Sequence, residues 1–160
     1  MNRKKTRDLG MRLLFEMMIK KENYLEVLTN LKEVTKKDEF VSDLIDADEK
    51  SKEKDPENWD LEEIDIQYLT RTLKGIEENE KELDKTIEKH LKKWKLDRLA
   101  KVDLAILRLS TYEILFDEDI PVNVSINEGV ELAKKYSEDK SPAFINAVLD
   151  NISKEKNKGC

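Results

Sequence analysis

The chain has 160 residues, of which 38% are hydrophobic and 41% charged, and its formal net charge is −6. This length suits one domain or two small subdomains that share a core. Such a polar composition favours amphipathic helices, in which one stripe is buried and the remaining surface is charged. Only four glycines and three prolines occur, too few for a β-sandwich or β-barrel with many tight turns.

Membrane insertion and secretion are both unexpected. The sequence contains no apolar run near eighteen residues and no signal-peptide pattern. Its single cysteine, Cys160, cannot form an intramolecular disulfide and fits a reducing compartment. We therefore expect a cytoplasmic protein.

The acidic total hides an uneven distribution of charge. Residues 1–21 carry seven basic and two acidic side chains, and residues 81–101 carry eight basic and four acidic ones. Residues 38–65, in contrast, carry three basic and thirteen acidic side chains. Because salt screens charges over about 8–10 Å, these local fields decide where a polyanion docks. The net charge restricts where RNA could bind but does not exclude RNA.

The first half of the chain predicts three helices and a linker. One helix is expected at Arg3–Ile19 and a second at about Tyr24–Thr35. A capping box at Asp60–Glu63 predicts the start of the third. The acidic residues 38–60 are expected to form a charged linker. Gly10, inside the first helix, costs up to about 1 kcal/mol relative to alanine, which a close helix–helix contact would explain.

The second half predicts four more helices. Apolar residues recur at helical spacing over Leu83–Leu91, over Asp97–Phe116 as a wide stripe, and over Ile126–Ala133 after the break at Pro121. Ser141-Pro142 supplies the cap and first position of the last helix. The sequence therefore predicts an all-α protein of about seven helices.

None of the patterns required for catalysis is present. His90 has no cysteine or second histidine to complete a metal site, and Cys160 has no base fixed beside it. We therefore predict that the protein is not an enzyme, with no catalytic residues, no metal and no cofactor.

The best candidate for a functional site is the basic segment, formed by Arg3, Lys4, Lys5 and Arg7. Apart from Asp8 these cations are expected to be unpaired, and from the residues alone a solvated tail is as compatible with them as a binding site. Arginines bind phosphates through paired hydrogen bonds and stack on unpaired bases, whereas lysines supply only charge. If all four neutralise a phosphate, the logarithm of RNA affinity should fall with that of salt concentration at a slope of about −3.

Four segments together point to a known family. They are RLAKVDLAILRLSTYEIL (Arg98–Leu115), DIPVNVSINEGVELAKKY (Asp119–Tyr136), SPAFINAVLD (Ser141–Asp150) and the basic opening that runs into a helix (Arg3–Phe15). In this order and at these short spacings they resemble the NusB family of transcription antitermination factors. The resemblance covers residues 3–16 and 61–152 and is poor between about 36 and 60.

The resemblance implies one NusB-like domain over residues 1–160, built as two small helical bundles that pack together. A subdomain over residues 1–80 would carry the basic segment and the linker, and one over 81–155 the central and last helices. The family binds boxA, a short single-stranded RNA element in the leaders of ribosomal RNA operons, together with NusE, a small-subunit ribosomal protein. The complex acts on elongating RNA polymerase with other Nus factors and suppresses termination. The resemblance also allows a homodimer.

For RNA binding, the resemblance implies the basic segment together with Lys140 and Phe144. Phe144 would stack on a base, although its position in an apolar stripe also suits the core, and Lys140 also suits an ordinary exposed lysine. Phe15 replaces the family's usual tyrosine, so any hydroxyl contact there is lost.

For NusE binding, the resemblance implies the central helix. Asp103 is the predicted partner contact, whereas Arg108 suits an internal salt bridge to Glu113 or Glu128 as well as it suits a partner. Two alternatives stay open: a helical protein-interaction scaffold with an idle basic segment, and an RNA-binding module that acts with a ribosomal RNA methyltransferase.

Overall fold

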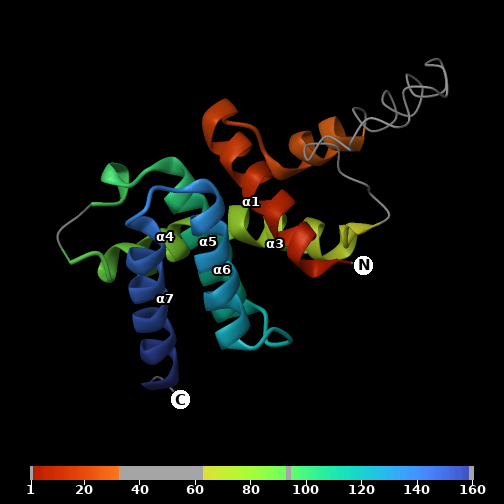
Figure 1. Ribbon diagram of the computed structural model, residues 1–160. Helices are drawn as coiled ribbons and strands as arrows, with labels where there is room; N and C mark the ends of the chain where they lie inside the picture. Colours follow the sequence, from red (N-terminus) through yellow and green to blue (C-terminus); the bar gives the residue numbers. More distant parts are fainter. Residues whose placement is uncertain (1, 33–62, 93–94, 159–160) are drawn as a thin grey trace, which may run out of the picture.

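The computed structural model describes residues 2–32, 63–92 and 95–158 (Figure 1). Every regular element in these ranges is helical. The helices are α1 (Arg3–Lys20), α3 (Ile66–Glu78), α4 (Glu80–Lys89), α5 (Lys101–Phe116), α6 (Val122–Tyr136) and α7 (Ser141–Lys158), with a 3₁₀ turn at Leu96–Arg98 and a further helical stretch over residues 24–32. The prediction of an all-α fold with about seven helices is confirmed.

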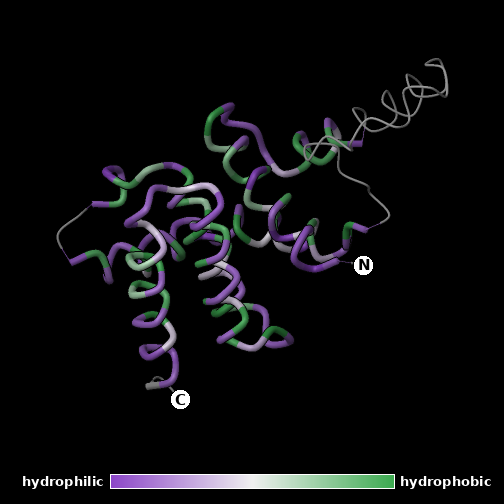
Figure 2. The backbone as a smooth tube through the Cα atoms, viewed as in Figure 1, coloured by the Kyte–Doolittle hydropathy of each residue, from purple (hydrophilic) through white to green (hydrophobic). Residues whose placement is uncertain are grey.

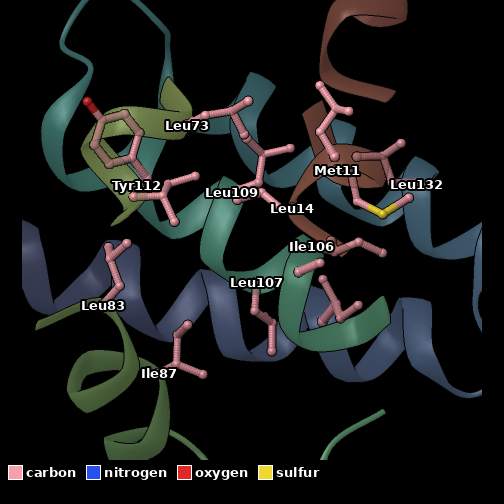
Figure 3. Close-up of a cluster of buried hydrophobic side chains, with 14 of the residues drawn as sticks. Met11, Leu14, Leu73, Leu83, Ile87, Ile106, Leu107, Leu109, Tyr112 and Leu132 are labelled. Carbon is pink, nitrogen blue, oxygen red and sulfur yellow. The ribbon is translucent and has the colours of Figure 1, made fainter. Parts of the chain in front are cut away.

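Helix α5 lies at the centre of the fold. It contacts α1 and α3 on one side and α4, α6 and α7 on the other. Figure 3 shows the hydrophobic cluster around it, with side chains from five helices: Met11, Leu14, Leu73, Leu83, Ile87, Ile106, Leu107, Leu109, Tyr112 and Leu132. Hydrophilic and hydrophobic residues alternate along α6 and α7 in Figure 2, as amphipathic helices require.

The helices therefore form two packed groups that share α5. The predicted division of the chain at residue 80 stays a prediction, because α5 packs against helices from both halves. None of the helices in the described ranges is long and apolar enough to cross a membrane. The predicted linker, the first three residues of the predicted capping box and Cys160 lie outside these ranges.

Helix α3 begins later than the capping box predicts. Its N-cap is Asp65, whose Oδ1 accepts a hydrogen bond from the backbone N–H of Tyr68 at 3.0 Å. The preceding turn is bound to α1 instead, because the Asn2 N–H donates to the carbonyl of Glu63 at 2.7 Å. Of the predicted capping box only Glu63 lies among the described residues, and tertiary hydrogen bonds hold it before α3, which starts at Ile66.

The central helix also begins later than predicted. The 3₁₀ turn at Leu96–Arg98 is followed by Leu99 and Ala100 in extended conformations, and α5 starts only at Lys101. Leu96 and Leu99 both pack against the core. The change of chain direction brings both leucines inward, and an uninterrupted helix from Asp97 is therefore a wrong prediction.

A buried ion pair joins α1 to α5. The Arg7 Nε donates to Glu113, 2.8 Å from Oε1 and 3.1 Å from Oε2, and the two side chains are 6% and 1% exposed. Burial raises the pKa of Glu113, and Arg7 opposes that rise by favouring the charged carboxylate. The ion pair therefore offsets the free-energy cost of burying the charged Glu113 carboxylate.

Helices α3 and α5 pack tightly against each other at Gly75. A Cβ at this position would lie 2.3 Å from the hydroxyl oxygen of Tyr112, whereas a Cβ at Gly10 would meet only Leu69 Cδ1 at 3.4 Å. The Tyr112 ring is buried and stacks on Phe116 with 5.3 Å between ring centroids. Of these two glycines, Gly75 is therefore the one required by the packing, and the contact expected at Gly10 is an ordinary one.

Replacing Gly75 with alanine should destabilise the protein by about 1–3 kcal/mol, because the Tyr112 ring must move out of its packed position. Gly10→Ala is the matched control and should stabilise by up to about 1 kcal/mol, since alanine favours a helix interior. Urea denaturation of both variants measures the difference. Equal effects at the two sites would contradict this account of the α3–α5 contact.

Replacing Arg7 with methionine should destabilise the protein by about 3–5 kcal/mol at neutral pH, because Glu113 becomes a buried charge without a partner. The pKa of Glu113 would rise further, so the stability of this variant should fall as pH increases and recover as pH decreases towards about 5. The double variant Arg7→Met/Glu113→Leu should recover most of the loss at every pH. Urea denaturation between about pH 5 and 8 tests this, and a pH-independent loss in Arg7→Met would contradict it.

Candidate nucleic-acid interface

The four cations of the basic segment differ sharply in exposure. The side chains of Arg3 and Lys5 are 42% and 51% exposed, whereas that of Arg7 is 6% exposed. Lys4 is exposed and has no acidic partner among the residues that the structure describes. The basic segment is therefore an exposed start of α1 followed by one buried arginine, rather than a free tail.

The turn before α3 supplies acidic partners for two of these cations. We call Glu63–Asp65 the acidic turn. Arg3 pairs with Asp65 at 3.3 Å, and Lys5 pairs with Glu63. The Arg3 guanidinium also lies 4.5 Å from the centroid of the Tyr68 ring. The prediction that the cations are unpaired apart from Asp8 is therefore wrong, because these partners come from distant positions in the sequence.

Asp8 pairs with α6 rather than with the basic segment. Its carboxylate accepts hydrogen bonds from Lys135 Nζ at 2.6 Å and from the Tyr136 hydroxyl at 2.5 Å. The hydrogen bond to Asp8 raises the pKa of Lys135, and burial raises that of Tyr136. Lys135 is therefore held as a cation next to the start of α1.

This contact brings a second group of lysines beside the basic segment. A hollow of about 420 Å³ between α1 and α6, here called the basic hollow, is lined by Lys4, Lys5, Asp8, Glu128, Glu131, Leu132, Lys134 and Lys135. Sequence analysis did not predict Lys134 and Lys135 as site residues. Their adjacency in the ELAKKY motif was visible, but their distance from the N-terminus in sequence gave no sign of the contact.

Three predicted site residues line one groove. This Phe144 groove, of about 830 Å³, lies between the start of α5 and the start of α7 and contains Asp103, Lys140 and Phe144. Lys140 is exposed, whereas Phe144 is half-buried and packs against the core while it lines the groove. Phe144 therefore packs against the core, while its stacking on an RNA base stays a prediction. Arg98 lines the same groove and was not predicted.

Asp103 is buried at the base of this groove. Its Oδ2 accepts a hydrogen bond from the Ser141 hydroxyl at 3.0 Å, whereas its Oδ1 is buried without a partner among the described residues. The hydroxyl of Ser137, which also lines the groove, is likewise buried and unpartnered there. Buried acceptors without donors are costly. Asp103 and Ser137 therefore retain unused hydrogen-bonding capacity in the wall of the groove.

Tyr136 connects the groove to α1. It lines the Phe144 groove and also a second groove of about 580 Å³, in which Phe15 and Arg12 of α1 lie. Its neighbour Lys135 lines the basic hollow, and Asp8 binds both side chains. The end of α6 therefore contributes Tyr136 to both grooves and Lys135 to the basic hollow.

Arg108 pairs differently from either prediction. It donates two hydrogen bonds of 2.8 Å to Asp84 and lies 3.3 Å from Glu80, both on α4. The predicted salt bridges to Glu113 or Glu128 are wrong, because Glu113 is occupied by Arg7 and α4 packs directly on α5. His90 is half-buried against Glu155, and no three His, Cys, Asp or Glu side chains within the described ranges are placed to hold a metal ion.

Known proteins of one family are similar to this chain over almost its whole length. The model of the NusB family matches residues 4–154. The transcription antitermination protein NusB of Clostridium tetani is 61% identical over 155 residues, which are 97% of this chain and 99% of the relative. NusB of Clostridium botulinum (strain Kyoto / Type A2) is 54% identical, over 95% and 99% of the two chains.

Solved structures give the same result. T. maritima NusB superposes with a TM-score of 0.72 at 32% identity, over 97% of this chain and 92% of that one. A chain from the structure of antitermination factors NusB and NusE in complex with dsRNA superposes with a TM-score of 0.70 at 26% identity, over 96% of both chains. Because the family model and these relatives match the chain over almost its whole length, the chain belongs to the NusB family.

Proposed function

We propose that this chain is a transcription antitermination factor that binds boxA RNA together with NusE and helps to suppress termination by elongating RNA polymerase. The observation that carries the proposal is the 61% identity to a NusB antitermination protein over nearly the full length of both chains. The solved complex of NusB and NusE with RNA supports both partners. The relatives' description as transcription antitermination proteins favours this function over that of a module acting with a methyltransferase.

The action is binding rather than chemistry, and we place it in the cytoplasm. Lys4, with Arg3 and Lys5, would contact RNA phosphates and supply affinity that does not depend on sequence. The Phe144 groove would receive an unpaired base, which stacks on the aromatic ring of Phe144. Lys140 at the rim of the groove would contact the adjoining phosphate.

Two predicted residues take changed roles in this proposal. Arg7 was predicted to contact RNA, but its burial against Glu113 favours a role in positioning α1. Asp103 was predicted to contact NusE. Because its carboxylate is buried and accepts a hydrogen bond from Ser141, it is better suited to hold the start of α7 beside the Phe144 groove.

Replacing Phe144 with leucine should lower affinity for boxA RNA by about 5- to 100-fold, the range that corresponds to loss of one base–aromatic stack. Leucine preserves an apolar contact with the core, so the fold should persist, as thermal unfolding would verify. Phe116→Leu is the matched control, since Phe116 is exposed at the far end of α5. Fluorescence anisotropy with labelled RNA provides the measurement, and equal affinities of the two variants would exclude stacking on Phe144.

The salt dependence of RNA binding should reflect the burial of Arg7. With Arg3, Lys4 and Lys5 as phosphate contacts, the log–log slope should be about −2 instead of about −3, and Lys4→Ala should reduce its magnitude by about 0.7. Lys154→Ala, which removes a lysine from an exposed pair on α7, should leave the slope unchanged. Titrations at four or more salt concentrations decide this, and a slope unaffected by Lys4→Ala would remove Lys4 from the interface.

A further inference from the structure

The acidic turn is held against the basic segment by hydrogen bonds that do not depend on ion pairing. The Asn2 N–H donates to the Glu63 carbonyl at 2.7 Å, and the Asp65 N–H donates to Thr6 Oγ1 at 3.0 Å. The Thr6 hydroxyl donates in turn to the carbonyl of Asn2 at 2.8 Å and is buried. The Glu63 and Asp65 carboxylates therefore stay beside α1 even when their ion pairs open.

These carboxylates occupy groups that would otherwise bind RNA. Asp65 accepts from the edge of the Arg3 guanidinium, while Tyr68 covers its face. One hydrogen-bond donor and one face of the guanidinium, the groups with which arginine pairs with phosphate and stacks on a base, are therefore engaged inside the protein. The ammonium group of Lys5 is similarly paired with Glu63.

The ion pairs are weak enough to be displaced. The side chains of Arg3, Lys5 and Glu63 are between 42% and 51% exposed, and an exposed pair of this kind shifts an equilibrium by about 1.4- to 5-fold. A bound RNA that places several phosphates along α1 can exceed this. A single phosphate contact to Arg3 or Lys5 contributes little net binding energy, because it replaces an internal ion pair of similar strength.

We propose that the acidic turn is an intramolecular competitor of RNA: Glu63 and Asp65 occupy Lys5 and Arg3 until RNA phosphates displace them. This inference rests on the proposed function and concerns the regulation of the same site. Because phosphate contacts carry no sequence information, the competitor lowers affinity for every RNA by the same factor. Sequence-independent binding is thereby kept weak, and discrimination is left to the Phe144 groove.

The proposal is tested by removing the competing charges from the full-length chain. Glu63→Gln should bind both a labelled boxA RNA and a labelled scrambled RNA about 2- to 5-fold more tightly at low salt. Asp65→Asn should add to this gain, and asparagine still serves as an N-cap for α3. Anisotropy titrations give the affinities, and thermal unfolding verifies that both variants are folded.

Two controls separate competition from a general change in charge. In a Lys5→Ala background, Glu63→Gln should give no gain, because the cation that it would release is absent. Asp150→Asn removes the same charge from an exposed pair with Lys154 on α7, whose far end lies away from the N-terminus in Figure 1, and should leave affinity unchanged. A gain that persists without Lys5, or that Asp150→Asn reproduces, would overturn the proposal.

Failure of this inference differs from failure of the proposed function. If Glu63→Gln and the parent protein bind boxA RNA equally well and both prefer it to the scrambled RNA, the competitor is refuted and the function stands. Suppose instead that the parent protein binds boxA and scrambled RNA equally, while Glu63→Gln increases affinity for both RNAs only when Lys5 is present. In that case the acidic turn competes with RNA, but the proposed boxA specificity is refuted. If no variant binds either RNA, both are refuted.

Discussion

The buried pair between Arg7 and Glu113 fixes the start of α1 against the central helix, and the geometry of the basic segment follows from it. Residues four apart share a helix face, so Arg3 lies on the same face as Arg7 and points towards α3, where Asp65 and Tyr68 receive it. Lys4 and Asp8 form the neighbouring face, which meets α6 at the basic hollow. One helix thereby presents its cations to two different surroundings.

Several buried polar side chains of the central helix make contacts with neighbouring helices. Glu113 receives Arg7 from α1, Asp103 receives Ser141 from α7, and Ser110 lies where α6 comes close, since a Cβ at Gly129 would be 2.5 Å from its hydroxyl oxygen. Each buried polar group has a cost that only a correctly placed partner removes. Of the two α5 carboxylates just named, Asp103 keeps one oxygen without a partner among the described residues, whereas both oxygens of Glu113 accept from Arg7.

Periodicity was sufficient to predict the helices, because a stripe of apolar residues records which face a helix buries. The resemblance to the NusB family, rather than periodicity, pointed to Lys140, Phe144 and Asp103, and only the fold shows that these residues line one groove. The pairing of the basic segment could not be predicted. Arg7 meets Glu113 across 106 residues and Arg3 meets Asp65 across 62, and a charge pattern cannot tell which distant acid will be adjacent. The late start of α3 has the same origin, since tertiary hydrogen bonds to Asn2 and Thr6 hold its preceding turn outside the helix.

The contrast between buried and exposed pairs explains how one short segment can serve both structure and binding. Removing the partner of a buried charge costs about 3–5 kcal/mol, whereas an exposed pair contributes about 0.2–1 kcal/mol. The first value is a large fraction of a typical folding free energy, so Arg7 is committed to the fold. The second is comparable to a single phosphate contact, so Arg3 and Lys5 can exchange an internal carboxylate for an RNA phosphate without loosening α1. The Lys5 side chain is about half exposed, whereas that of Arg7 is almost completely buried. This difference in burial separates Arg7, which positions α1, from Arg3 and Lys5, which can bind RNA.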